Sequence, residues 1–177
     1  MEPPVIETAR LVLRPHRLDD FDALAAMWRE PDIVRYISGK PSTREQSFAR
    51  LLRYAGHWRL LGFGYWAIED RQSGAFAGEV GFADLRRDIE PSLEGMPELG
   101  WMVAPRWQGR GYATEAVRGC LTWGAQRFPA GTRLACIVTP DNAASIRVAE
   151  KCGFVPAGRT TYLGDEVMRY ERDAVSD

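Results

Sequence analysis

The stretch ELGWMVAPRWQGRGYATEAVRGCLTWGAQRF, residues 98–128, decides the fold of this chain. Its first six residues, Glu98 to Val103, predict a short strand that Pro105 ends. The glycine-rich turn of residues 108–113 leads into a helix, which Pro129 stops. The stretch therefore predicts a strand, a glycine-rich loop and a helix in direct succession.

The helix is predicted from the spacing of its apolar residues, which fall on one face. They are Ala113, Ala116, Val117, Cys120, Leu121, Gly124 and Phe128. The first backbone N–H groups of a helix have no partner inside it, and the macrodipole adds partial positive charge there. Gly109 and Gly111 would let a phosphate approach the backbone, and Arg110 adds a cation. We therefore expect an anion at the start of this helix.

Two common phosphate-binding motifs are excluded by the residues present. A Walker loop needs Lys-Ser or Lys-Thr after its last glycine, where this chain has Tyr112-Ala113. A dinucleotide fingerprint needs a third glycine and a later acid, where Thr114 and Leu134 stand. The pattern that remains is Gln108-x-x-Gly111-x-Ala113, which resembles the acyl-CoA pyrophosphate loop of the GNAT superfamily of N-acetyltransferases.

Two further segments carry the same resemblance. Residues 142–154, NAASIRVAEKCGF, are similar to the Asn-x-x-Ser-x-x-x-x-x-Lys-x-Gly-Phe signature of that superfamily. Residues 8–15, TARLVLRP, look like the opening strand of the branch that acetylates protein N-termini, ribosomal proteins included. The cofactor-binding residues that the resemblance implies are Met102, Val103, Gln108, Gly109, Arg110, Gly111, Tyr112, Ala113, Thr114, Asn142, Ser145 and Lys151.

The resemblance also implies a fold of the α/β (α+β) class. We expect a mixed, largely antiparallel sheet with helices on both faces, splayed between the fourth strand at Glu98 and the fifth at Leu134. The pantetheine arm of CoA would enter that splay and pair with backbone near Met102 and Val103. The other expected strands are 11–14, 64–69, 76–84, 154–161 and 167–171. The other expected helices start at Asp19 or Asp20 and end at Pro31, start at Ser42 or Thr43, and start at Asp141 or Asn142.

Length and composition limit the remaining possibilities. The 177 residues suit a single domain, residues 1–177, with a full core. The 23 basic and 24 acidic residues nearly cancel, so no basic surface for nucleic acid is expected. Three cysteines without metal-ligand spacing are expected to be buried, reduced thiols, and no metal is expected. Without a signal peptide or a long apolar run, a cytoplasmic protein with no membrane partner is expected. The assembly state, a homodimer included, is left open.

Acetyl transfer from a thioester to an amine suggests roles for two residues. An amine must lose a proton, and Glu98 stands where several GNAT members carry a glutamate that acts as a base, usually through water. A strand-end salt bridge is its structural alternative. Ser145 could donate a proton to the thiolate of CoA, or it could be only a first-turn helix residue. Backbone N–H groups near Met102 or Val103 could bind the carbonyl oxygen.

The acceptor is left open by the sequence. The resemblance to the N-terminal branch favours a protein N-terminus attacking acetyl-CoA directly in a ternary complex. A small amine, such as a polyamine, an amino acid or an antibiotic, is the alternative. The loop of residues 85–97 contains Asp88, Glu90 and Glu94, which suit a cationic amine, although Arg86 and Arg87 oppose them. A plain solvated loop is the alternative interpretation. A non-catalytic acyl-CoA-binding domain is the rival from another class.

Overall fold

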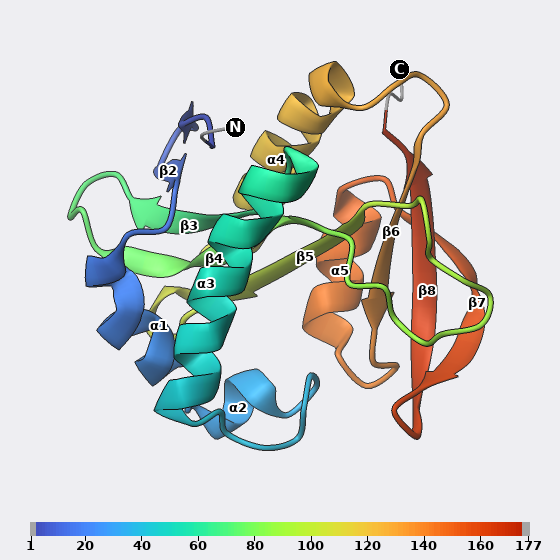
Figure 1. Ribbon diagram of the computed structural model, residues 1–177, viewed down its shortest axis with the longest axis horizontal. Helices are drawn as coiled ribbons and strands as arrows, with labels where there is room; N and C mark the ends of the chain where they lie inside the picture. Colours follow the sequence, from blue (N-terminus) through green and yellow to red (C-terminus); the bar gives the residue numbers. More distant parts are fainter. Residues whose placement is uncertain (1–2, 175–177) are drawn as a thin grey trace.

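A computed structural model describes residues 3–174, in which eight strands form one sheet (Figure 1). The strands are β1 (Ile6–Glu7), β2 (Leu11–Arg14), β3 (Tyr65–Asp70), β4 (Phe76–Ala83), β5 (Glu98–Val103), β6 (Arg133–Val138), β7 (Val155–Tyr162) and β8 (Asp165–Asp173). The helices are α1 (Phe21–Met27), α2 (Pro31–Val34), α3 (Arg44–Leu61), α4 (Tyr112–Arg127) and α5 (Ala143–Lys151), with 3-10 turns at Leu18–Asp20 and Pro105–Trp107.

The sheet has the order β1-β2-β3-β4-β5-β6-β8-β7, and every neighbouring pair except one is antiparallel. The exception is the parallel pair β5–β6, which is joined at a single register position, Glu98 opposite Ala135. The two strands separate beyond that point, toward Val103 and Val138. The predicted mixed, largely antiparallel sheet is thus confirmed. The strands that separate, β5 and β6, are those expected as the fourth and fifth; their numbers differ by one because β1 had not been predicted.

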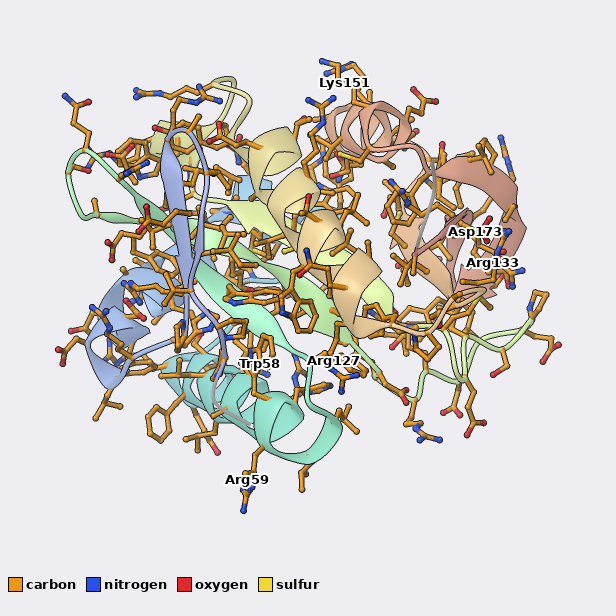
Figure 2. All side chains as sticks on the ribbon, turned by 90° about the horizontal axis from the view of Figure 1, so that it is seen from above. Trp58, Arg59, Arg127, Arg133, Lys151 and Asp173 are labelled. Carbon is orange, nitrogen blue, oxygen red and sulfur yellow. The ribbon has the colours of Figure 1, made fainter. Side chains whose placement is uncertain are left out.

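The helices cover both faces of the sheet. Apolar residues of α4 pack with Trp66, Phe82 and Leu99 in the largest cluster, on one face. Residues of α1, α2 and α3 pack with Met102 on the other. Figure 2, which views the molecule from above, shows α3 below the sheet and α4 and α5 above it. The helices on two faces expected from the sequence are confirmed.

The loop of residues 84–97 extends the cover on the α3 face. Ile89 and Leu93 pack against Ala135 and Val167, and Figure 1 shows the loop passing in front of β6, β8 and β7. As expected, the loop contains no helix or strand. β5 therefore lies at the boundary between this loop and the helices α1–α3, a boundary that we call the seam.

Two expectations near the first helices were wrong. The helix starting near Asp20 ends at Met27, and Pro31 begins α2 instead of ending a helix, because proline is well tolerated at the first helical position. Asp20 does not cap α1; its carboxylate is bound by Arg14 and by the backbone N–H of Arg17. The cap of α3 is confirmed at Thr43, whose hydroxyl accepts from the N–H of Gln46.

The three cysteines, Cys120, Cys136 and Cys152, are buried free thiols, as expected. Over residues 3–174, no helix has the length and hydropathy that a membrane span requires.

Candidate active site

The gap between β5 and β6 exposes backbone groups of β5. The N–H of Ala104 donates to the carbonyl of Ala77 on β4 at 2.9 Å. Because an antiparallel ladder alternates, Met102 also directs its N–H and C=O toward β4, whereas Trp101 and Val103 direct theirs toward the gap. Of the two residues expected to meet pantetheine, Val103 is therefore placed to do so through its backbone, and Trp101 is a candidate that the sequence argument did not name.

The glycine-rich loop ends in uncapped N–H donors. Gly109 and Gly111 have φ values of 73° and 80°, which side chains rarely adopt. No side chain caps α4, and its first intrahelical bond to a loop carbonyl is made by the N–H of Glu115. The N–H groups of residues 112–114 are thus available to an anion. A Cβ built on Gly109 would meet no protein atom within 4 Å, so that position is open to a ligand.

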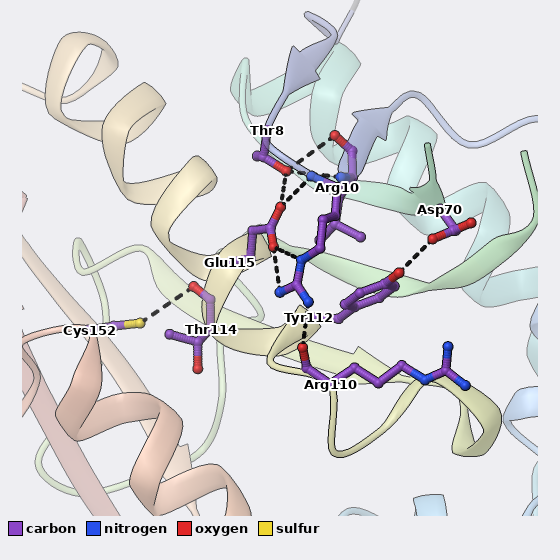
Figure 3. A network of polar contacts seen from close by, with 9 residues as sticks. Thr8, Arg10, Asp70, Arg110, Tyr112, Thr114, Glu115 and Cys152 are labelled. Carbon is purple, nitrogen blue, oxygen red and sulfur yellow. Dashed lines mark hydrogen bonds and ion pairs between the residues drawn. The ribbon is translucent and has the colours of Figure 1, made fainter. Parts of the chain in front are cut away.

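A polar network fixes the start of α4 to the first strands (Figure 3). The carboxylate of Glu115 accepts from the hydroxyl of Thr8 at 2.7 Å and from the backbone N–H of Arg10 at 2.8 Å. The Arg10 guanidinium binds the same carboxylate and donates to the carbonyl of Arg110 at 2.8 Å. The hydroxyl of Tyr112 donates to Asp70 at 2.5 Å. These bonds to residues of the first strands therefore fix the conformation of the glycine-rich loop and of the start of α4.

A side-chain hydrogen bond of Gln108 also supports the glycine-rich loop. Its side-chain amide donates to the carbonyl of Val103 at 2.9 Å, across the 3-10 turn of residues 105–107. This bond ties the loop to the end of β5. Gln108 thus acts here on the protein backbone, and the side chain of Arg110 is exposed at the loop surface.

The start of α5 lies at the same sheet edge as the start of α4, because both helices follow the carboxyl ends of parallel strands. Asn142, and not Asp141, is the cap: its side-chain oxygen accepts from the N–H of Ser145 at 3.1 Å. The Ser145 side chain is half-buried, and its hydroxyl makes no hydrogen bond within residues 3–174. Lys151 lies at the opposite end of α5, where Figure 2 shows it at the molecular surface.

Glu98 is buried at the beginning of β5 and forms an ion pair. Its two oxygens accept from Nε and from an Nη of Arg87 at 2.7 and 2.8 Å. Val103 lies five residues further along the strand, roughly 16 Å away. Glu98 and the Val103–Ser145 edge thus occupy opposite ends of the gap, and the structure does not bring Glu98 and Ser145 together.

A cavity of about 620 Å³ opens next to Glu98. Its walls are formed by the loop of residues 84–97 and by Thr161. Five carboxylates and two guanidinium groups line it: Asp84, Asp88, Glu90, Glu94 and Glu98, with Arg86 and Arg87. Arg86 is paired with Asp84 and Glu94, whereas Asp88 and Glu90 form no ion pair within the described chain. The excess of negative charge favours a cationic guest.

Glu79, on β4 opposite Met102, is a buried acid that the sequence argument missed. One of its oxygens accepts from the hydroxyl of Tyr54 at 2.5 Å and from the indole N–H of Trp28 at 3.2 Å; the other accepts no hydrogen bond and lies 4.0 Å from Nε2 of His16. Burial raises the pKa of Glu79 to about 7, against the hydrogen bond from Tyr54, which lowers it. A lone acid inside the apolar strand FAGEVGFA was the available signal, since both faces of that strand are buried.

Comparison with known proteins identifies relatives over most of the chain. The family profile described as an acetyltransferase (GNAT) domain matches residues 10–155. The chain is 34% identical over 157 residues to the uncharacterized protein YkkB of Bacillus subtilis, covering 87% of this chain and 86% of YkkB. It is 26% identical to the uncharacterized N-acetyltransferase YoaA of the same organism, covering 88% and 85%.

Solved structures share the fold over nearly the whole chain. A protein of Bordetella pertussis, assigned to the GnaT-family acetyltransferases, superposes with a TM-score of 0.84 at 32% identity, covering 96% and 99% of the two chains. Two more distant structures show the fold alone. One is an acetyl transferase of Salmonella typhimurium that modifies the N-terminal serine of a ribosomal protein (TM-score 0.76, 20% identity, 96% and 99% covered). The other is spermidine N-acetyltransferase of Vibrio cholerae (TM-score 0.73, 19% identity, 94% and 97% covered).

Proposed function

Because the chain belongs to the GNAT acetyltransferases, we propose that it transfers an acetyl group from acetyl-CoA to a primary amine in the gap between β5 and β6. The observation that carries the proposal is the meeting of two features at one sheet edge. The gap offers the backbone of Trp101 and the N–H of Val103, whose carbonyl is bound by Gln108, and the uncapped start of α4 lies directly after it. The backbone suits the amide groups of pantetheine, and the helix start suits the pyrophosphate.

The donor occupies one side of the molecule and the acceptor the other. The residues proposed for the pyrophosphate are Gly109, Arg110, Gly111, Tyr112, Ala113 and Thr114, with Gln108 holding the loop. Asn142 and Lys151 remain proposed contacts to CoA. The acceptor would lie on the α3 face, in the seam beside β5, where the acid-lined cavity opens. In this arrangement the CoA arm approaches the reaction centre from one face of the sheet, and the amine approaches the thioester from the α3 face.

The reaction needs one bond to form and one to break. The amine nitrogen attacks the thioester carbonyl carbon, and backbone N–H groups of β5 donate hydrogen bonds to the carbonyl oxygen as it becomes negative. The C–S bond then breaks. Glu98 is the proposed base. Arg87 already fills one lone-pair site on each of its oxygens, and Glu98 lies at the far end of the gap from Ser145, so the proton reaches Glu98 along several water molecules.

Ser145 is the proposed proton donor to the departing thiolate. Its backbone N–H serves the cap with Asn142, which leaves the hydroxyl uncommitted. A thiol has a pKa near 8.5, so the thiolate needs little assistance, and one hydroxyl or a water molecule is enough. Burial raises the pKa values of Cys120 and Cys136, which disfavours the thiolate that a cysteine nucleophile needs. The proposed reaction therefore has no covalent enzyme intermediate.

The proposed acceptor is a cationic primary amine, with a protein N-terminus as the first candidate. A small polyamine is the second, because the unpaired Asp88 and Glu90 on the cavity wall suit additional positive charges. A neutral or anionic amine finds fewer partners there.

Acetyl-CoA turnover against a panel of free N-terminal peptides and small amines tests the proposal. Thiol release and the mass of the product are both followed, with N-terminally blocked peptides as matched controls. We expect acetylation of at least one cationic amine and none of the blocked peptides. Tight acetyl-CoA binding without turnover on any amine would instead indicate a non-catalytic acyl-CoA-binding domain.

A further inference from the structure

The side chain of Tyr65, on β3, crosses the neighbouring strand β4 to reach β5. Tyr65 on β3 stands opposite Gly81 on β4, and Gly81 stands opposite Gly100 on β5. Neither glycine has a side chain in the path, and a Cβ built on Gly100 would overlap the Tyr65 hydroxyl oxygen. The hydroxyl therefore lies directly over Gly100, on the strand that borders the gap.

This position is the middle of the proposed reaction centre. On the α3 face of β5, Gly100 is two residues from Glu98 and two from Met102, so each neighbour lies roughly 7 Å away. The hydroxyl thus stands between the acid that lines the cavity and the part of β5 that faces the donor. It occupies the stretch that separates Glu98 from the Ser145 edge.

The surroundings keep Tyr65 a neutral phenol. Burial raises its pKa first, and the negative charges of Glu98 and Glu79 raise it further. The ring stacks on Tyr54 with centroids 4.8 Å apart and planes at 10°, and the Tyr54 hydroxyl is anchored on Glu79. The ring is therefore held firmly by its face, while two carboxylates stand near its hydroxyl.

The Tyr65 hydroxyl has no use in the folded chain itself. The side chain is half-buried, and within residues 3–174 the hydroxyl makes no hydrogen bond. The hydrogen bond from the indole N–H of Trp58 goes to the backbone carbonyl of Tyr65 and leaves the hydroxyl unused. A phenylalanine would stack on Tyr54 equally well, so packing does not account for the oxygen.

We propose that the Tyr65 hydroxyl binds the nitrogen of the acceptor amine and aims it at the thioester, an inference that rests on the proposed function. The phenol oxygen accepts an N–H of the incoming ammonium group, and Glu98 and Glu79, partly offset by Arg87 and Arg53, favour its positive charge. After the proton has passed through water to Glu98, the same bond holds the neutral amine over Gly100. Tyr65 and Gly100 together are then determinants of amine binding, and not of CoA binding.

Calorimetry on the full chain with CoA bound tests this contact directly. The probes are spermidine and the tetrapeptide Ser-Ala-Ala-Ala with a free amino group. Tyr65→Phe should weaken the affinity for the better probe about 10- to 100-fold, as expected for one lost hydrogen bond to a charged group. The CoA affinity should stay within about twofold, because the hydroxyl lies on the acceptor side.

Tyr170→Phe is the matched control. Tyr170 is buried on the opposite face of the sheet, and within residues 3–174 its hydroxyl makes one hydrogen bond, to the sulfur of Met168. The same loss of one phenol oxygen there should change neither affinity. Gly100→Ala is an independent second variant, in which Tyr65 is unchanged but the added methyl group must displace its hydroxyl. This variant should therefore weaken amine binding as Tyr65→Phe does.

The outcomes separate this inference from the proposed function. Unchanged amine affinity in a folded Tyr65→Phe protein would overturn the inference and leave the function standing. Amine binding that depends on Tyr65, without turnover in the wild type, would support the inference and overturn the proposed function. Equal losses of amine and CoA affinity in Tyr65→Phe would overturn the inference about Tyr65, because they would indicate a general loss of structure.

Discussion

At the scale of single residues, Glu98 has two tasks in one place. Its ion pair with Arg87 joins the start of β5 to the cavity loop, and the same carboxylate is the proposed base. A catalytic base and a strand-end salt bridge were both expected for Glu98, and the ion pair is present. The pair does not remove the catalytic reading, because each carboxylate oxygen keeps a further acceptor site for water.

Glu98→Gln should lower kcat/KM for the amine about 100-fold or more near pH 7, because the amide cannot take the proton. The rate should recover partly at high pH, where the free amine is already neutral. The acetyl-CoA affinity should hardly change, and the melting temperature controls for the lost ion pair. A pH–rate profile with the shape of the wild-type profile would leave Glu98 with the ion pair alone.

Ser145→Ala should reduce turnover about tenfold to a thousandfold if the hydroxyl donates to the departing sulfur. Folding should be unaffected, because the cap uses the backbone N–H of residue 145 and alanine keeps it. Stopped-flow measurement of the acetyl-transfer step, with CoA affinity as control, gives the answer. Full activity of the variant would assign the proton to water.

At the scale of elements, the unit β5–loop–α4 was predictable because local rules set all of it. Alternating and helical spacing, two glycines and Pro105 specify the strand, the turn and the helix without tertiary information. Pro31 was misread because a proline signals a helix end or a helix start with equal strength. β1, at Ile6–Glu7, is too short to have a pattern and exists only through its pairing with β2.

The loop element supports a test with two nearly isosteric substitutions. Gly109→Asp and Gly109→Asn introduce side chains of nearly the same shape at a φ of 73°, and an added Cβ there meets no protein atom within 4 Å, so they differ mainly in charge toward the ligand. We expect Asp to weaken acetyl-CoA binding at least about tenfold more than Asn, since it repels the pyrophosphate. Calorimetry provides the two affinities. Equal affinities would place the pyrophosphate elsewhere.

At the scale of the whole molecule, the site is a seam between two coverings of one sheet. The loop of residues 84–97 covers β6, β8 and β7, and the helices α1–α3 cover β2–β5. The sequence predicted the parted strands by resemblance, but not the seam, because the loop has no regular pattern. Glu79 and Tyr65 were missed for a related reason: their roles depend on cross-strand neighbours, which a single strand sequence does not contain.

Buried acids and bases under this seam make the stability of the molecule depend on pH. The folded pKa of Glu79 is raised to about 7 from 4.5, mainly by burial, so the stability it contributes is present below pH 4.5 and lost as the pH rises to 7. The pKa of His16, near Glu79, is lowered to about 4 from 6.5 by burial, so its contribution is lost as the pH falls through that range. Arg50, whose pKa is lowered by burial, also faces Glu79.

Glu79→Gln should therefore gain stability relative to the wild type as the pH rises from 5 to 8. The gain should reach about 1–3 kcal/mol in the free energy of unfolding, because glutamine never has to bury a charge. His16 and Arg50 are the same in both proteins, so their titration largely cancels in the difference. Thermal melts across this pH range measure it, and a difference independent of pH would show that Glu79 is not the titrating group.

Backbone amide exchange with and without acetyl-CoA tests most directly whether the gap between β5 and β6 holds the donor. The account predicts slower exchange at Trp101, Val103 and residues 112–114, whose N–H groups would gain partners. Met102, already paired with β4, should exchange at an unchanged rate. Protection confined to other segments, with these amides unaffected at saturating acetyl-CoA, would contradict the account.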